Sequence, residues 1–236
     1  GCLRVAMTLF PLGLKMWQHE LAALAVTGIV YGALVALVQK DFKFVIGYSS
    51  VSHMGFVLLG LVTLNEIGWS GAVLQMFSHG VIAGLLFGVV GRMVYDRAHT
   101  RELDKLEGMG LLKAMPFAAV TFVIAGFASM GMPGFSGFVA EFLIFAGLFE
   151  RYPWFGALAV LGAAITATYI LRLLATAFFG PVNPRWEGLK GPNPAEGLSA
   201  AILCGGLLLV GLFPAFLMQP ISVGVAALMQ SVLSAG

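Results

Sequence analysis

Long apolar runs separated by short charged stretches extend along the whole chain. Several of these runs continue for about 20 residues or more without a charge, which is the length that an α-helix needs to cross about 30 Å of hydrocarbon. The chain is therefore predicted to be an all-α membrane protein, built as a polytopic transmembrane helix bundle. With charged residues as boundaries, the pattern predicts about six spans, at residues 21–39, 45–65, 67–91, 114–149, 154–179 and 198–218.

The fourth run is too long for a single span. It is interrupted by the segment Gly131-Met132-Pro133-Gly134, where proline removes a backbone donor and glycine loosens the turn. We predict a broken helix here, with Gly131, Pro133 and Gly134 at the break.

The two ends of the chain are predicted to differ from the bundle. Residues 1–14 are interpreted as the end of a preceding transmembrane helix, because the chain opens on Gly1 without a methionine or a signal-peptide pattern, like a piece of a longer polypeptide. Residues 15–236 form the bundle. After Pro220 the apolar tail is too short to cross again, so we expect a short amphipathic or interfacial helix there.

The distribution of charged residues along the chain indicates membrane topology and not a ligand-binding surface. Hydrophobic residues make up 59% of the chain and charged residues 10%, against about 25% charged in a typical soluble domain. The net charge of +2 is too small, and its cations are too scattered, for a nucleic-acid-binding surface. Lysine and arginine are instead retained in cytoplasmic loops. They fall after the first, third and fifth predicted spans: Lys40 and Lys43; Arg92, Arg97, Arg101, Lys105 and Lys113; Arg172, Arg185 and Lys190.

This alternation predicts that those three loops lie inside and that the C-terminus lies outside, with Lys15 as the exception. The stretch 180–197, rich in proline and glycine, is predicted to be one of the inner loops.

The sequence carries no signature of catalytic or redox chemistry. Phosphate-binding Gly-rich loops, Cys-x-x-Cys pairs and dinucleotide fingerprints are missing from it. Cys2 and Cys204 lack metal-ligand spacing. We therefore expect no catalytic residue, cofactor or metal in this chain.

Glu141 is the most unusual residue for a membrane span. It lies in the second half of the predicted broken helix, far from the next charge at Glu150, and a charged side chain at that depth costs about 2.5–3.5 kcal/mol on insertion scales. The functional interpretation is a carboxyl group that accepts and releases protons. The alternative is a permanently protonated carboxyl, hydrogen-bonded to a carbonyl group that Pro133 leaves free.

Two histidines lie near the middle of the second and third predicted spans. His53 has Ser49 four residues before it, with Ser52 beside it, and His79 has Gln75 four residues before it. Spacing of four residues places side chains on one helix face, and imidazole exchanges protons near neutral pH. The pattern indicates a shared polar axis, although a histidine within a span can also serve packing alone.

Lys43 lies at the start of the second span, and its side chain has two possible interpretations. Its side chain could point down the polar stripe toward His53, or its ammonium group could extend to the inner membrane surface. Arg172, near the inner end of the fifth span, is interpreted as an anchor.

These residues resemble a known family. Lys40-Asp41-Phe42-Lys43, Ser50-Val51-Ser52-His53-Met54-Gly55-Phe56, Gln75-Met76-Phe77-Ser78-His79-Gly80 and the stretch from Gly131 to Phe142 are similar, in the same order, to the antiporter-like subunits of respiratory complex I. Within that family, the branch called subunit M or chain 4 is the most similar. The resemblance covers nearly the whole chain.

The resemblance implies a fold and a function. The six spans would be the ninth to fourteenth of a fourteen-helix fold of two inverted repeats, in which buried lysines, histidines and a glutamate relay protons. His53, His79 and Lys43 would belong to the relay, and Glu141 would be its terminal carboxyl group near the outer exit. The family usually has arginine after the lysine, whereas Phe44 stands here, which puts a paired basic site in doubt.

The resemblance also implies partners and a location. NADH, FMN, iron–sulfur clusters and quinone would be bound by other subunits of NADH:quinone oxidoreductase, and neighbouring antiporter-like subunits would be partners in the bilayer. The location would be the bacterial inner membrane, or alternatively the mitochondrial inner membrane. Related multisubunit cation/proton antiporters and membrane-bound hydrogenases share the motifs, and a purely structural membrane subunit is the alternative of another class.

Overall fold

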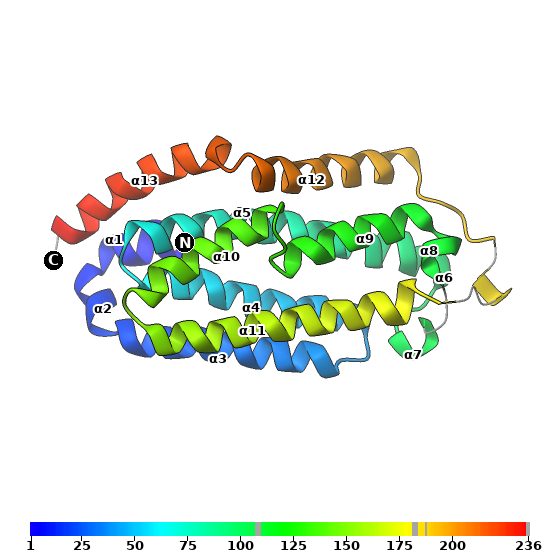
Figure 1. Cartoon of the computed structure of the whole chain (residues 1–236), viewed down its shortest axis with the longest axis horizontal. Helices are drawn as coiled ribbons and strands as arrows, with labels where there is room; N and C mark the ends of the chain where they lie inside the picture. The colour runs from blue at the N-terminus through cyan, green and yellow to red at the C-terminus, as the bar shows by residue number, and fades with distance from the viewer. Residues whose placement is uncertain (107–109, 181–183, 187, 235–236) are drawn as a thin grey trace.

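The computed structural model describes residues 1–106, 110–180, 184–186 and 188–234, and helices dominate these ranges (Figure 1). In chain order the elements are η1 (Cys2–Ala6), α1 (Met7–Leu9), α2 (Pro11–Met16), α3 (Gln18–Val38), α4 (Phe42–Val62), α5 (Glu66–Phe87), η2 (Gly88–Tyr95), α6 (Asp96–Ala98), α7 (Leu103–Leu106), α8 (Leu111–Ala114), α9 (Pro116–Ser129), α10 (Ser136–Phe149), α11 (Pro153–Leu173), η3 (Leu174–Phe178), η4 (Pro184–Trp186), α12 (Pro194–Leu212) and α13 (Ala215–Ser234).

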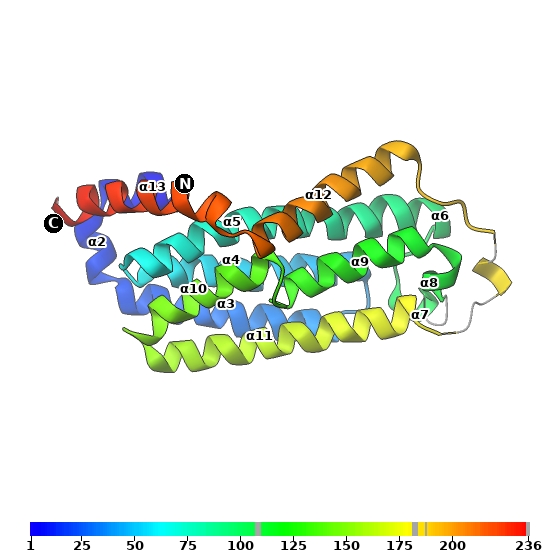
Figure 2. The ribbon, with the colours of Figure 1, turned by 45° about the horizontal axis from the view of Figure 1, so that its top comes forward.

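The long helices run roughly parallel to one axis of the molecule (Figures 1 and 2). Among the described residues, 6 helices are long and apolar enough to cross a membrane: Gln18–Val38, Phe42–Val62, Glu66–Ala98, Pro153–Phe178, Pro194–Leu212 and Ala215–Val232. The fourth predicted run forms two consecutive 14-residue helices, α9 and α10, on either side of the Gly-Pro-Gly break. The prediction of an all-α membrane bundle with one broken helix is confirmed.

The last predicted span divides differently from the expected pattern. Helix α12 ends at Leu212, and α13 begins at Ala215 and continues through Pro220. Phe213 precedes Pro214, and the proline ring disfavours helical backbone in the residue before it, so the chain turns there. The tail is therefore a 20-residue helix, longer than the short interfacial helix that we expected.

Residues 1–14 were expected to form the end of a single helix, but the structure shows an interrupted one. They form η1, α1 and the start of α2, and the backbone departs from helical angles at Phe10, directly before Pro11. The same effect of proline on its predecessor explains this interruption.

Helix α4 lies at the centre of the bundle, with 67% of its most apolar window buried. Small residues allow α3 to approach it closely. A Cβ atom added at Gly55 would lie 2.6 Å from Cγ1 of Ile29 and 2.8 Å from the carbonyl oxygen of Ala25. Ser52 Oγ donates a hydrogen bond to the Ile29 carbonyl oxygen across the same contact, at 3.0 Å. The α3–α4 pair is thus fixed by close backbone approach and a buried hydrogen bond.

The loops after α3, α6 and α11 gather at one end of the bundle, opposite the end that holds α2 (Figure 1). We call this the basic end, because it carries the cations of those three loops. Arg101 Nε lies 2.6 Å from Asp41 Oδ2, and an Arg97 nitrogen lies 2.7 Å from Glu196 Oε2. The predicted alternation of basic loops therefore corresponds to one physical end of the molecule, while its orientation across a membrane stays a prediction.

Candidate proton-relay site

His53 lies at the point where α4, α5, α9 and α10 meet, and its side chain is 2% exposed. Its Nε2 atom is 3.0 Å from Ser129 Oγ, at the last residue of α9. Its Nδ1 atom is 3.4 Å from the Gln75 amide nitrogen on α5. With the amide in this orientation Nδ1 is the acceptor, so the neutral ring carries its proton on Nε2 and donates it to Ser129.

Glu141 lies on α10 directly beside this histidine. Its side chain is buried, and Oε1 is 3.7 Å from His53 Nδ1. This distance exceeds that of a hydrogen bond, which is about 2.7–3.2 Å. A small side-chain rotation or one bridging water would connect the carboxyl group to the ring.

The helix break is in contact with the Glu141 carboxyl group. Gly131 has a φ of +66°, a left-handed conformation that glycine adopts readily, and a Cβ atom added to it would lie 2.5 Å from Glu141 Oε2. The carboxyl group therefore fills the space that a side chain at position 131 would need. Gly131 serves both the turn and the site.

His79 lies next to His53, with their ring centroids 5.2 Å apart. Its Nδ1 is buried without a hydrogen-bonding partner among the described residues, and the same is true of Gln75 Oε1, Ser78 Oγ and Ser136 Oγ. Buried polar atoms usually bind a protein group or an ordered water. Each of these atoms on α5 and α10 is therefore available to an ordered water or another partner.

A second buried pair extends the polar face of α4 toward the basic end. Tyr169 on α11 donates its hydroxyl hydrogen to Ser49 Oγ at 2.7 Å. Ser49 is one helical turn before His53, so this pair lies on the same face of α4 as the ring. Ser52, by contrast, binds the backbone of α3 and has a packing role.

Lys43 is not brought into the cluster. It lies in the first turn of α4, where Asp41 accepts a hydrogen bond from its backbone nitrogen at 2.8 Å, and the residue is exposed. At a rise of about 1.5 Å per residue it is about 15 Å along the helix from His53. Of the two interpretations left open, the structure matches the one in which the ammonium group extends to the surface.

Sequence reasoning did not single out Ser129, Tyr169, Ser78 or Ser136. A signal existed for two of them: Ser129 is a polar residue at the end of an apolar half-helix, and Tyr169 follows Thr166 at the three-residue spacing of one helix face. Within the described ranges, histidine, cysteine, aspartate and glutamate side chains do not gather in a group of three or more that could hold a metal ion. The arrangement as a whole is a group of neighbouring proton donors and acceptors inside an apolar bundle.

Comparison with known proteins gives a consistent result. Residues 1–166 match the family described as NADH:quinone oxidoreductase/Mrp antiporter, TM. NADH-quinone oxidoreductase subunit M of Rhodobacter capsulatus is 39% identical over 232 residues, which are 98% of this chain and 45% of that protein. The chain thus spans about half the length of the curated relatives it matches.

Solved structures share the fold. Respiratory complex I from Thermus thermophilus with bound NADH contains a chain that matches with a TM-score of 0.87 at 34% identity, over 97% of this chain and 48% of that one. The Mrp complex from Dietzia sp. DQ12-45-1b matches with a TM-score of 0.80 at 20% identity, over 92% of this chain and 49% of that one. The second likeness is one of fold alone.

Proposed function

Because the chain belongs to the NADH:quinone oxidoreductase/Mrp antiporter transmembrane family, we propose that it forms part of a proton-translocating membrane subunit of NADH:quinone oxidoreductase. The observation that carries this proposal is the buried contact of Glu141 with His53 and of His53 with His79, beside the break between α9 and α10. An ionisable residue inside a membrane span is expensive, and such residues usually mark an ion path. Irregular backbone at that depth is tolerated where it lines a cavity or is buried in protein.

His53 is the central carrier in this proposal. Its two ring nitrogens face different partners, Ser129 on one side and Gln75 with Glu141 on the other. A proton that arrives at one nitrogen can leave from the other, which is the property that suits imidazole to a relay. His79 would pass protons to or from His53 through the unpartnered atoms between α5 and α10.

Glu141 is the terminal group of the path within this chain. Its Oε1 atom lies 3.7 Å from His53 Nδ1, and Gly131 leaves space for the carboxyl group. A protonated carboxyl group is neutral and a deprotonated one is charged, so each proton that passes changes the charge at the centre of the bundle. Lys43 stands outside this path in its geometry, and we leave it out of the proposed relay.

The energy for pumping would come from partners. NADH, FMN, iron–sulfur clusters and quinone would be bound by other subunits, and quinone reduction there would shift the protonation of this axis. Such a shift requires that the partner subunits interact differently with the protonated and the deprotonated state of the axis. The partners would be the other membrane subunits of the complex, including neighbouring antiporter-like subunits. The chain is a membrane protein, and we place it in the bacterial inner membrane, with the mitochondrial inner membrane as the alternative.

The test uses Glu141→Gln in the complete protein within its assembled complex. Proton translocation into vesicles is measured beside quinone-reductase activity and beside the amount of assembled complex. We expect translocation to fall while assembly persists, because the amide has nearly the shape of the carboxyl group but does not carry the proton. Glu150→Gln, an exposed residue just after α10, is the matched control and should pump normally. Lost assembly with unchanged pumping per complex would support a structural subunit instead.

A second candidate is a subunit of a multisubunit cation/proton antiporter, which the family description favours because it also includes the Mrp antiporter. The two candidates differ in their source of energy. Translocation that depends on quinone reduction and not on sodium supports the first, whereas sodium-dependent exchange without quinone chemistry supports the second. Membrane-bound hydrogenase relatives would fail the quinone test in the same way.

A further inference from the structure

A separate pocket of about 420 Å³ lies at the basic end of α4 and α5, away from the relay. Its apolar side includes Phe87, Val90 and Gly91, and Lys43 and Arg92 are among the residues that line it. The volume falls within the range of about 300–1,000 Å³ that is usual for small-ligand pockets. The pocket therefore combines an apolar surface with cationic groups, and the relay uses neither.

The cations at this pocket exceed the acids. Three cations, Lys43, Arg92 and Arg101, and one acid, Asp96, line it. Arg101 pairs with Asp41 at 2.6 Å, and Arg92 pairs with Asp96 at 3.2 Å. The ammonium group of Lys43 has neither a hydrogen bond nor an ion pair within the part of the chain that the structure describes. One positive charge is thus left for a ligand, with two guanidinium groups beside it.

The length of the helical stretch beside the pocket bears on its depth in a bilayer. Residues Glu66–Ala98 form one continuous helical stretch of 33 residues, which at about 1.5 Å per residue is about 50 Å long. The hydrocarbon core is only about 30 Å thick, or about 40–45 Å with the headgroup regions. Because Arg92, Asp96 and Arg97 gather at its C-terminal end, we expect that end in the headgroup layer, and Tyr95, 46% exposed, has the amphipathic character typical of that layer.

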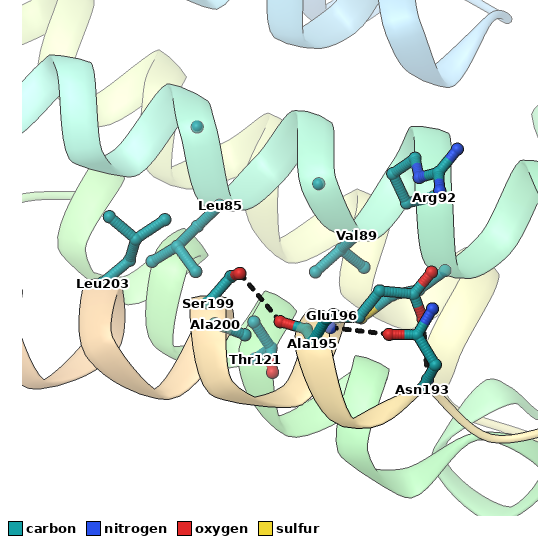
Figure 3. Close-up of a pocket in the computed structure, with 13 residues that line it drawn as sticks. Leu85, Val89, Arg92, Thr121, Asn193, Ala195, Glu196, Ser199, Ala200 and Leu203 are labelled. Carbon is teal, nitrogen blue, oxygen red and sulfur yellow. Dashed lines mark hydrogen bonds between the residues drawn. The ribbon is translucent and has the colours of Figure 1, made fainter.

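The groove on the other side of Arg92 provides a contrast (Figure 3). It lies between α12 on one side and α5 with η2 on the other, and its charged groups are paired. Asn193 Oδ1 accepts from the Glu196 backbone nitrogen at 2.8 Å, and Ser199 Oγ donates to the Ala195 carbonyl oxygen at 2.8 Å. The Glu196 carboxylate is paired with Arg97. That groove has no free charge to hold a headgroup, whereas the Lys43 pocket has one.

We propose that the Lys43 pocket binds an anionic phospholipid. The phosphate group lies among Lys43, Arg92 and Arg101, and one acyl chain follows the apolar wall of Phe87, Val90 and Gly91. Basic pockets between transmembrane helices on the cytoplasmic side recognise such headgroups, and each nearby lysine or arginine strengthens the attraction. An acidic segment of a partner protein would satisfy the cations but not the apolar wall.

The experiment uses the complete protein in its assembled complex, reconstituted in phosphatidylcholine vesicles. A trace of photoactivatable phosphatidylglycerol, with the reactive group on its acyl chain, is compared with the matching phosphatidylcholine probe. We expect the anionic probe to label residues 87–95 preferentially. Lys43→Gln should reduce that labelling about fivefold, which corresponds to the loss of one cation near the surface, and Lys43→Arg should retain it.

Two glycines provide a steric test. A Cβ atom added at Gly91 meets nothing within 4 Å, so Gly91→Leu fills the pocket without a clash and should reduce labelling. Gly84→Leu fills the groove of Figure 3 instead and should leave labelling unchanged. Lys40→Gln, an exposed cation paired with Asp104 outside the pocket, should also have no effect.

Several results would overturn the proposal. Equal labelling by both probes would show that the pocket does not recognise the headgroup charge. Labelling that is unchanged by Lys43→Gln and Gly91→Leu would show that the lipid does not bind in this pocket. Loss of labelling in Gly84→Leu alone would move the lipid to the other groove. Photocrosslinks from residues 87–95 to another polypeptide, with no lipid adduct, would show a protein partner. If Lys43→Gln does not assemble, the Lys43→Arg and Gly91→Leu results decide.

Discussion

Oε1 of Glu141 lies 3.7 Å from Nδ1 of His53, although the two residues belong to different helices and lie far apart in the sequence. The other carboxyl oxygen, Oε2, occupies the space beside Gly131 that a Cβ atom would need. Its position relative to the ring thus depends on the conformation of the helix break. Movements of a few tenths of an ångström at the break would change whether the two groups form a hydrogen bond.

Gly131→Ala is expected to impair the relay. The new methyl group would lie 2.5 Å from Glu141 Oε2, and the left-handed backbone costs an L-residue about 1–2 kcal/mol. Proton translocation per assembled complex should fall, because the carboxyl group must move. Gly134→Ala is the control: its φ is +95°, but the nearest side-chain atom is 4.0 Å away. It should lower stability without the same loss of pumping, and equal pumping in both variants would contradict the assigned contact.

His53→Ala and His79→Ala are expected to reduce translocation less than Glu141→Gln does, since water can bridge the position of a missing imidazole. His53 has partners on both sides, so its loss should be the larger of the two. Vesicle pumping at equal quinone-reductase activity measures the effect. Wild-type pumping in both alanine variants would refute the histidine relay.

Tyr169→Phe removes the hydroxyl group that donates to Ser49 at 2.7 Å. We expect a loss of about 0.5–1.5 kcal/mol in stability, the net value of a typical intramolecular hydrogen bond. Ser49→Ala should cost a similar amount, and the double variant should cost less than the sum, because both remove one interaction. Chemical denaturation of the purified complex provides the measurement, with Tyr48→Phe as the control. Additive effects would show that the two groups act separately.

Gly55→Ala is expected to separate α3 from α4. The added methyl group would lie 2.6 Å from Ile29 Cγ1 and 2.8 Å from the Ala25 carbonyl oxygen, and overpacking of this kind costs about 1–3 kcal/mol. Gly47→Ala on the same helix meets nothing within 4 Å and should be neutral. The yield of assembled complex and its thermal stability give the readout. A neutral Gly55→Ala would mean that the two helices separate without cost.

Most of the fold was predictable because the length of a span and its lack of charge are local properties of the sequence. The predicted second span, 45–65, corresponds to α4, and the break at Gly131–Gly134 lies where the sequence indicated. The turn at Phe213 was missed. The residues on both sides of it are apolar, so the hydrophobic pattern continues across the turn, although Pro214 moves the backbone of Phe213 out of the helical conformation.

The site was predictable only in part. Burial of Glu141 and His53 follows from their position within apolar runs, and both are buried in the structure. Their proximity to each other, to Ser129 and to Gly131 depends on how α4, α9 and α10 pack, and no local pattern contains that information. Lys43 shows the reverse case: its place next to a polar stripe in the sequence suggested a relay role, whereas the start of the helix places it at the surface.

The contact between Gly131 and Glu141 also bears on how this helix pair can vary. A methyl group at 131 would displace Oε2 of Glu141, so the conformation of the carboxyl group depends on the residue at 131. For mutational scanning or redesign, the two positions are therefore coupled and are best varied together, because effects measured at one of them alone need not add.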